Sequence, residues 1–228
     1  MAKDKKTERV IPGFLPYWQI VVWTGILMLV WGFGSYIINV LTSSCVPHCF
    51  PPFSGCVPIS NAGSSGVISS IFYRGMVLPL ASFIGISLYF IIQYLDAKGY
   101  ISSSVMKGIL FFTGVIFTAG SLIVTQALLN GQGSASRLIS RLHVLFAFFA
   151  FMGLIIYEFI VSLILVRGEK SGFNTFLFVL SLLSIFIVVA GATFLSSIHH
   201  MGNIVEWNLF IVLMVWLILM GVKLKPAE

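Results

Sequence analysis

The chain has 228 residues, of which 58% are hydrophobic and 9% are charged, and its mean hydropathy is +1.04. A soluble domain carries about 25% charged residues, so this composition excludes a cytosolic enzyme, a nucleic-acid-binding protein and a disordered protein. The net charge of +6 does not indicate a nucleic-acid partner, because the Lys and Arg residues lie at the ends of apolar runs, where such residues orient membrane proteins. We therefore expect a polytopic helical membrane protein.

Six apolar runs are each long enough to cross a bilayer, which takes about 20 mostly apolar residues. Helices are expected because lipid offers no hydrogen-bond partners to open backbone groups, and the runs lack the short alternating segments of a β-barrel. The sequence predicts an all-α bundle of six transmembrane helices, forming one domain over residues 1–228. The predicted helices are 18–41, 71–95, 105–129, 142–166, 173–195 and 204–222.

The distribution of positive charge predicts the orientation of this bundle. The polar N-terminal segment MAKDKKTERV leads directly into the first apolar run, which is too long for a cleaved signal peptide and is expected to be an uncleaved anchor. One side of the bundle holds ten Lys and Arg residues, and the other holds only Arg74, Arg137 and Arg141. The positive-inside rule then places both termini in the cytoplasm. The loop over 42–70, which contains no Lys or Arg, is therefore predicted to be luminal or extracellular.

All three cysteines, Cys45, Cys49 and Cys56, fall in this loop. An oxidising compartment permits a disulfide there, and three cysteines allow three pairings between which the sequence does not choose. With His48 they also form a set of zinc-type ligands, but the spacing is a weak signal. We expect one disulfide, and no metal or other cofactor. Haem is not expected, because only one histidine, His143, lies within a predicted span.

Ionisable residues in membrane spans are costly and indicate functional sites. Arg74, His143 and Glu206 each lie in the first turn of a helix that is predicted to enter from the luminal side, so we expect them at a similar depth. One interpretation is an Arg74–Glu206 ion pair that joins two helices. Another is a luminal pocket for a lipid headgroup or another small anion, anchored by Arg74. A third, a catalytic pairing of His143 with Glu206, has no recognisable nucleophile motif beside it.

Four short motifs extend this luminal layer. They are PISNAG at 58–63, SSIFYRGMVLPLA at 69–81, His143 followed by AFFAF, and Glu206 followed by Trp207. In these motifs the chain resembles the DRAM/FRAG/SFK family of six-helix membrane proteins, although SSGV at 64–67 replaces the Pro-Pro-Glu-type step that often follows the loop motif. The positions that match the family pattern are Ile59, Ser60, Gly63, Phe72, His143, Glu206 and Trp207. The predicted lipid-binding or structural polar cluster is Arg74, His143, Glu206, Trp207, Ser60 and Asn61, with no catalytic residue among them.

The resemblance implies a function at a membrane. Members of this family modulate autophagy from lysosomal membranes, assist GPI-anchor lipid remodelling in the Golgi, or help to organise phosphoinositide synthesis at the plasma membrane. We therefore expect a non-catalytic multi-pass protein of an endomembrane or the plasma membrane, which recognises lipid or scaffolds other membrane proteins through its luminal polar site. Two alternatives are a lipid-modifying enzyme similar to the GPI-remodelling members, and an accessory subunit of a larger membrane complex.

Overall fold

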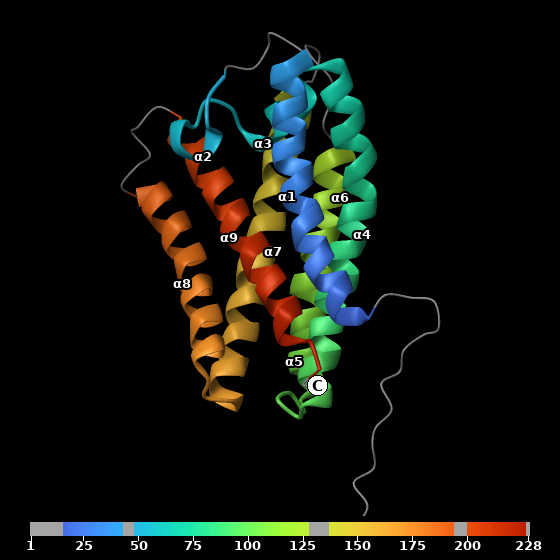
Figure 1. Cartoon of the computed structure of the whole chain (residues 1–228), viewed down its shortest axis with the longest axis vertical. Helices are drawn as coiled ribbons and strands as arrows, with labels where there is room; N and C mark the ends of the chain where they lie inside the picture. The colour runs from blue at the N-terminus through green and yellow to red at the C-terminus, as the bar shows by residue number, and fades with distance from the viewer. Residues whose placement is uncertain (1–15, 43–47, 128–136, 194–199, 227–228) are drawn as a thin grey trace, which may run out of the picture.

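Helices make up all the regular secondary structure that the computed structural model describes, which covers residues 16–42, 48–127, 137–193 and 200–226. Within these residues, six helical stretches are long and apolar enough to cross a membrane, as the composition predicts. Figure 1 shows them as an elongated bundle. The spanning stretches are α1 (Tyr17–Thr42), α4 (Val67–Ala97), the run of α5 (Ser104–Leu110), η1 (Phe111–Ala119) and α6 (Gly120–Ala127), then α7 (Arg137–Gly168), α8 (Gly172–Thr193) and α9 (Met201–Lys223).

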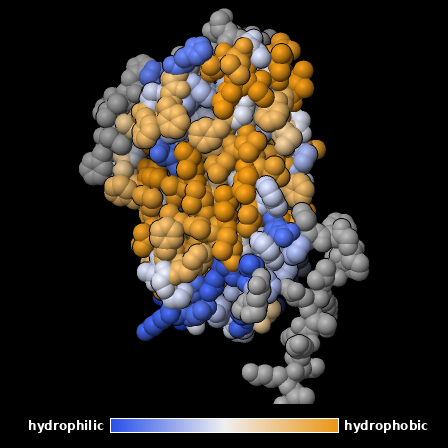
Figure 2. Space-filling model, in the orientation of Figure 1, coloured by the Kyte–Doolittle hydropathy of each residue, from blue (hydrophilic) through white to orange (hydrophobic). Residues whose placement is uncertain are grey.

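The two ends of the bundle differ in character. Helix α1 begins and α9 ends at the lower end in Figure 1, which we call the terminal end, whereas the short helices α2 (Pro51–Ser54) and α3 (Ile59–Ser64) lie at the opposite loop end. Figure 2 shows a broad apolar band around the middle of this face and hydrophilic residues gathered at its lower end. This distribution is that of a membrane-spanning bundle. Which end faces the cytoplasm stays a prediction from the charge count.

Two ion pairs within the described residues lie at the terminal end. Lys107 pairs with Asp96 at 2.6 Å and Lys223 pairs with Glu169 at 2.9 Å. The Lys223 hydrogen bond and charge hold the pKa of the exposed Glu169 carboxyl below its ordinary value. Each pair joins the ends of two different helical stretches, so the pairs position the helices relative to one another outside the apolar band.

Helix α1 packs against both α4 and α9. Close approach between α1 and α9 depends on small residues, because a Cβ added at Gly32 would lie 2.8 Å from the Phe210 ring and one at Gly25 would lie 3.0 Å from the Met214 carbonyl. Such contacts are typical of membrane helix pairs, in which van der Waals packing drives association. Helix α8 lies at the edge of the bundle against α7 and α9, and much of its outer face is exposed.

The third spanning stretch is not the continuous α-helix that the sequence predicts, because η1 in its middle is π-helical. The hydroxyl of Thr118 donates to the carbonyl of Thr113, five residues earlier, at 2.9 Å. Gly153 of α7 lies against both residues, since a Cβ there would be 2.7 Å from the Thr118 hydroxyl oxygen. The wider π turn therefore occurs where α7 approaches most closely, which hydropathy alone does not reveal.

Helices α4, α7 and α9 begin about one turn earlier than predicted. The prediction counted apolar residues, whereas the helices extend through polar residues at the loop end, such as Ser69, Arg141 and Asn203. Consequently His143 and Glu206 lie in the second turn of their helices and Arg74 lies in the third, not in the first turn. All three residues are deeper in the bundle than the sequence indicated.

The cysteine-containing loop also has more structure than predicted, because it contains the helices α2 and α3. A disulfide joins Cys49 to Cys56 across α2, and it uses two of the four candidate zinc ligands. Proline occupies the first turn of α2, where its missing N–H is not needed. Gly55 ends the helix with a φ of +60°, a conformation that favours glycine. Cys45 lies outside the described residues.

This pairing predicts a specific peptide map. Protein purified without reductant and digested after thiol blocking should yield one bridged peptide pair, Cys49 with Cys56, and should carry the alkyl group on Cys45. Mass spectrometry with and without reduction measures both products. A bridge that includes Cys45 would contradict the assignment.

Candidate functional site

The loop-end segment is attached to α1 by two polar side chains that α1 carries near its end. The Tyr36 hydroxyl donates to the Cys49 carbonyl at 2.6 Å and accepts from the Cys49 N–H at 2.9 Å. The Asn39 amide donates to the Ala62 carbonyl at 2.8 Å. Tyr36 and Asn39 are both buried, so these bonds are shielded from water and anchor both the disulfide and α3.

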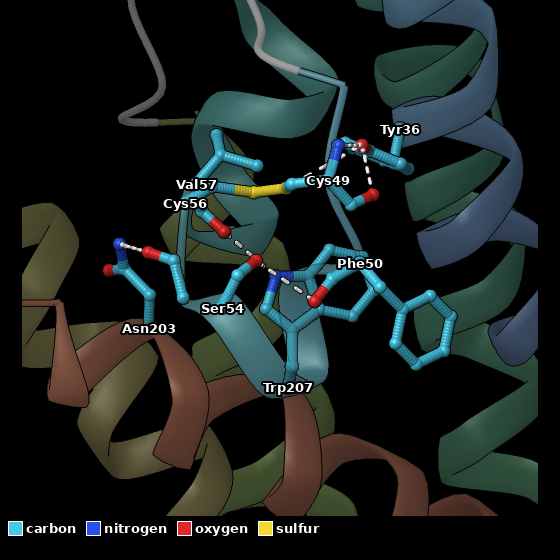
Figure 3. Close-up of a disulfide and its surroundings, with 9 residues drawn as sticks. Tyr36, Cys49, Phe50, Ser54, Cys56, Val57, Asn203 and Trp207 are labelled. Atoms are coloured by element: carbon cyan, nitrogen blue, oxygen red, sulfur yellow. Dashed lines mark hydrogen bonds between the residues drawn. A yellow bond between two sulfur atoms is a disulfide. The ribbon is translucent and has the colours of Figure 1, made fainter.

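Three side chains of α9 bind the same segment from its other side. The Trp207 indole N–H donates to the Val57 carbonyl at 2.8 Å, and the Asn203 amide donates to the Gly55 carbonyl at 2.7 Å. Figure 3 shows both bonds below the disulfide. The Asn208 amide donates to the Pro52 carbonyl at 2.7 Å. Asn203 and Trp207 are four residues apart and so lie on the same face of α9, and Asn208 follows Trp207, so this end of α9 supplies donors to three consecutive parts of the segment.

These bonds show how deep the segment lies. Asn208 is about two turns from the first residue of α9, which is about 10 Å along the helix axis at 1.5 Å per residue. Because Asn208 binds Pro52, α2 lies beside the spanning helices and not beyond their ends. Irregular backbone at membrane depth is stable only when protein groups satisfy its polar atoms. The amide and indole donors of α1 and α9 do this here.

Helix α3 lies directly over the interior of the bundle. Its residues Ile59 and Ala62 are buried, and Gly63 lies so close to the Tyr73 ring that an added Cβ would overlap it. The Glu206 carboxylate lies near the Ile59 N–H, which is the first N–H of α3. The PISNAG motif therefore forms a short helix that is fixed to α1, α4 and α9, with Ser60 facing inward.

A cavity lies beneath α3 and is partly open to the surface. Residues of α1, α3, α4, η1, α6, α7 and α9 line it. Its polar lining residues are Ser60, Thr118, Thr125, His143 and Glu206, whereas Met28, Ile84, Leu154, Leu213 and Met214 are among its apolar ones.

Four of the five polar groups lie at the loop end of the cavity, and the fifth, Thr118, lies deeper, against Gly153, with its hydroxyl bound to the Thr113 carbonyl. Along α9 the lining passes from Glu206 to Phe210 and Met214, and along α7 it passes from His143 through Ala147 to Leu154. The eleven-residue step from His143 to Leu154 corresponds to roughly 16 Å of helix. The cavity is thus polar where it meets α3 and mostly apolar in the middle of the bundle.

One hydrogen bond determines the tautomer of His143. Its Nδ1 lies 2.8 Å from the backbone carbonyl oxygen of Thr125. A carbonyl oxygen only accepts, so Nδ1 carries the hydrogen, and Nε2 of the neutral ring is an acceptor. Thr125 lies in the last turn of α6, where carbonyls lack partners within the helix. The Thr125 hydroxyl oxygen is buried and has no hydrogen-bond partner among the described residues.

The structure brings three of the predicted cluster residues together, namely Ser60, His143 and Glu206. Arg74 is exposed and is not among the residues that line the cavity. Its neighbour Tyr73 faces the interior, with 2% of its surface exposed, and adjacent residues on a helix point about 100° apart. An Arg74–Glu206 pair is not among the ion pairs within the described residues.

The remaining predicted residues have other environments. Trp207 is fully buried and binds the Val57 carbonyl, and Asn61 is exposed on α3. Sequence reasoning missed Thr118 and Thr125, which share a helix face at a spacing of seven residues, and it missed Asn203 and Asn208. The two asparagines could have been noticed in the sequence, because amide side chains within an apolar run need hydrogen-bond partners in lipid.

Compared with known proteins, the chain matches no family model, no curated protein and no solved structure. Its function is therefore inferred from the cavity and from the residues that line it.

The hydrogen bond from Trp207 to the Val57 carbonyl leads to a prediction about stability. Trp207→Phe keeps the aromatic ring but leaves the buried Val57 carbonyl without its donor, which costs about 1–3 kcal/mol. We expect a clearly lower thermal unfolding midpoint in detergent. Trp23→Phe is the matched control, because Trp23 is 51% exposed on α1. Equal midpoints for the two variants would contradict a structural role for the indole N–H.

Proposed function

We propose that this chain is an integral membrane protein of the DRAM/FRAG/SFK type that binds one lipid-like amphiphile in the cavity beneath α3, without catalysing a reaction. The observation that carries the proposal is the polarity of the cavity, whose lining changes from Glu206 and His143 at the loop end to Leu213 and Met214 deeper in the bundle. An amphiphile has the same polarity, with a polar head and an apolar chain.

The lining and orientation of the cavity support this function. Small-molecule sites combine apolar walls with a few well-placed polar groups, and this cavity combines apolar walls with five polar lining residues. Most of its polar groups lie toward the loop end of the spanning helices and its apolar walls lie toward the middle of the bundle. An amphiphile bound with its head toward the loop end therefore has the orientation of a lipid in the leaflet on that side.

The location of the protein is part of the same proposal. A Cys49–Cys56 disulfide at the loop end fits an oxidising lumen or the cell exterior, on the side opposite the positively charged end. The family resemblance favours the lysosome, the Golgi or the plasma membrane. Membrane lipids are then the primary partners, and the exposed outer face of α8 is available to other membrane proteins.

Filling the cavity tests lipid binding. Ala147 lines the cavity from α7, whereas Val144 on the same helix is 63% exposed. Native mass spectrometry of protein purified in mild detergent should detect one bound lipid, and Ala147→Phe should lower the occupied fraction several-fold because the new ring takes the space of the chain. Val144→Phe should retain the wild-type occupancy. Equal occupancy in both variants would contradict the proposal.

One observation favours a lipid-modifying enzyme as the second candidate function. Ser60, His143 and Glu206 line the same cavity, and His143 presents an unprotonated Nε2 in its neutral form, as a general base requires. Incubation with labelled phospholipid or GPI lipid should then give a hydrolysed or transferred product. His143→Ala should abolish turnover of the lipid that is still bound. Absence of product from the wild-type protein in the presence of bound lipid would exclude this candidate.

A further inference from the structure

The polar end of the cavity consists of hydrogen-bond acceptors and hydroxyls. Glu206 contributes a carboxylate, His143 contributes the Nε2 of its neutral ring, and Thr125 contributes a buried hydroxyl without a partner. No Lys or Arg lines the cavity in the described part of the chain. The lipid phosphate anchor that the sequence suggested, Arg74, faces away from it.

A carboxylate in such a place needs a partner. Burying a charge is costly unless the charge is paired or hydrogen-bonded. The Glu206 carboxylate lies near one backbone donor, the Ile59 N–H, although a carboxylate can accept about four hydrogen bonds. The described ion pairs are both at the terminal end and neither involves Glu206 or His143. A cationic ligand would therefore supply Glu206 with a counter-charge that no described Lys or Arg side chain provides.

We infer that the cavity takes a single-chain amphiphile with a protonated amine headgroup. This inference rests on the proposed lipid-binding function and specifies its ligand class. An ammonium group has three donors and no acceptor, which matches Glu206, the Nε2 of His143 and the Thr125 hydroxyl. The chain then lies along Ala147, Leu154 and Leu213. A fatty acid places a second carboxylate beside Glu206, and a fatty alcohol has a single donor and no charge to pair.

Competition among three probes of equal chain length tests the inference. Dodecylamine, dodecanol and dodecanoic acid have chains whose extended length is similar to the roughly 16 Å between His143 and Leu154. Each competes at neutral pH with a photoreactive alkyl probe for labelling of the protein in nanodiscs. Hydrogen bonds to charged groups are worth about 1.5–3 kcal/mol, so dodecylamine should compete at least about tenfold better than dodecanol, and dodecanoic acid should compete least.

Glu206→Gln is the decisive variant, because it keeps the size of the side chain and an acceptor oxygen near the Ile59 N–H while the charge is removed. The variant should still be labelled by the photoreactive probe, but dodecylamine should compete about as well as dodecanol and no better. Glu169→Gln is the matched control, since Glu169 is exposed at the terminal end, and it should keep the preference of the wild type.

The outcomes separate the inference from the proposed function. If no competitor protects the cavity and Ala147→Phe does not reduce labelling, the lipid-binding function fails. If labelling requires the cavity but the amine competes no better than the alcohol, or if Glu206→Gln keeps the amine preference, lipid binding stands and the amine assignment is overturned.

Discussion

The loop end of this protein depends on side-chain donors that bind backbone carbonyls at membrane depth. The segment between α1 and α4 turns back into the bundle, and lipid would not solvate its backbone. Tyr36 and Asn39 of α1 and Asn203, Trp207 and Asn208 of α9 bind it instead. This requirement explains why strongly apolar helices carry amides and indoles on their inward faces, and why the segment adopts one conformation.

The same anchoring produces the cavity. Because Asn39 binds the Ala62 carbonyl, α3 is held over the bundle, and its residues Ile59 and Ser60 line the space beneath it. Glu206 lines the same cavity and lies near the first N–H of α3. A ligand that pairs with this carboxylate therefore binds directly beneath α3.

Much of the fold was predictable from sequence, because spanning helices are identified by uninterrupted apolar length, a property of composition. The shared depth of His143 and Glu206 also followed from topology and charge. The direction in which a side chain points could not be predicted in this way, because it depends on the rotational phase of the helix. Arg74 lies one position after an inward-facing Tyr73 and so points outward. The helices α2 and α3 were missed because their stability comes from tertiary bonds to α1 and α9, which no local propensity reveals.

The π-helical stretch η1 lets the third spanning stretch hold an extra residue without turning the wall of the cavity. Beyond η1, helix α6 presents Leu122 and Thr125 to the cavity, and the Thr125 carbonyl binds the His143 ring. An extra residue in a regular α-helix would rotate everything after it by about 100° about the helix axis. A π turn contains about one residue more than an α turn, so the wide turn absorbs that residue instead. Deleting one residue from 111–119 and closing the stretch to an ordinary α-helix would therefore leave Thr125 beside His143.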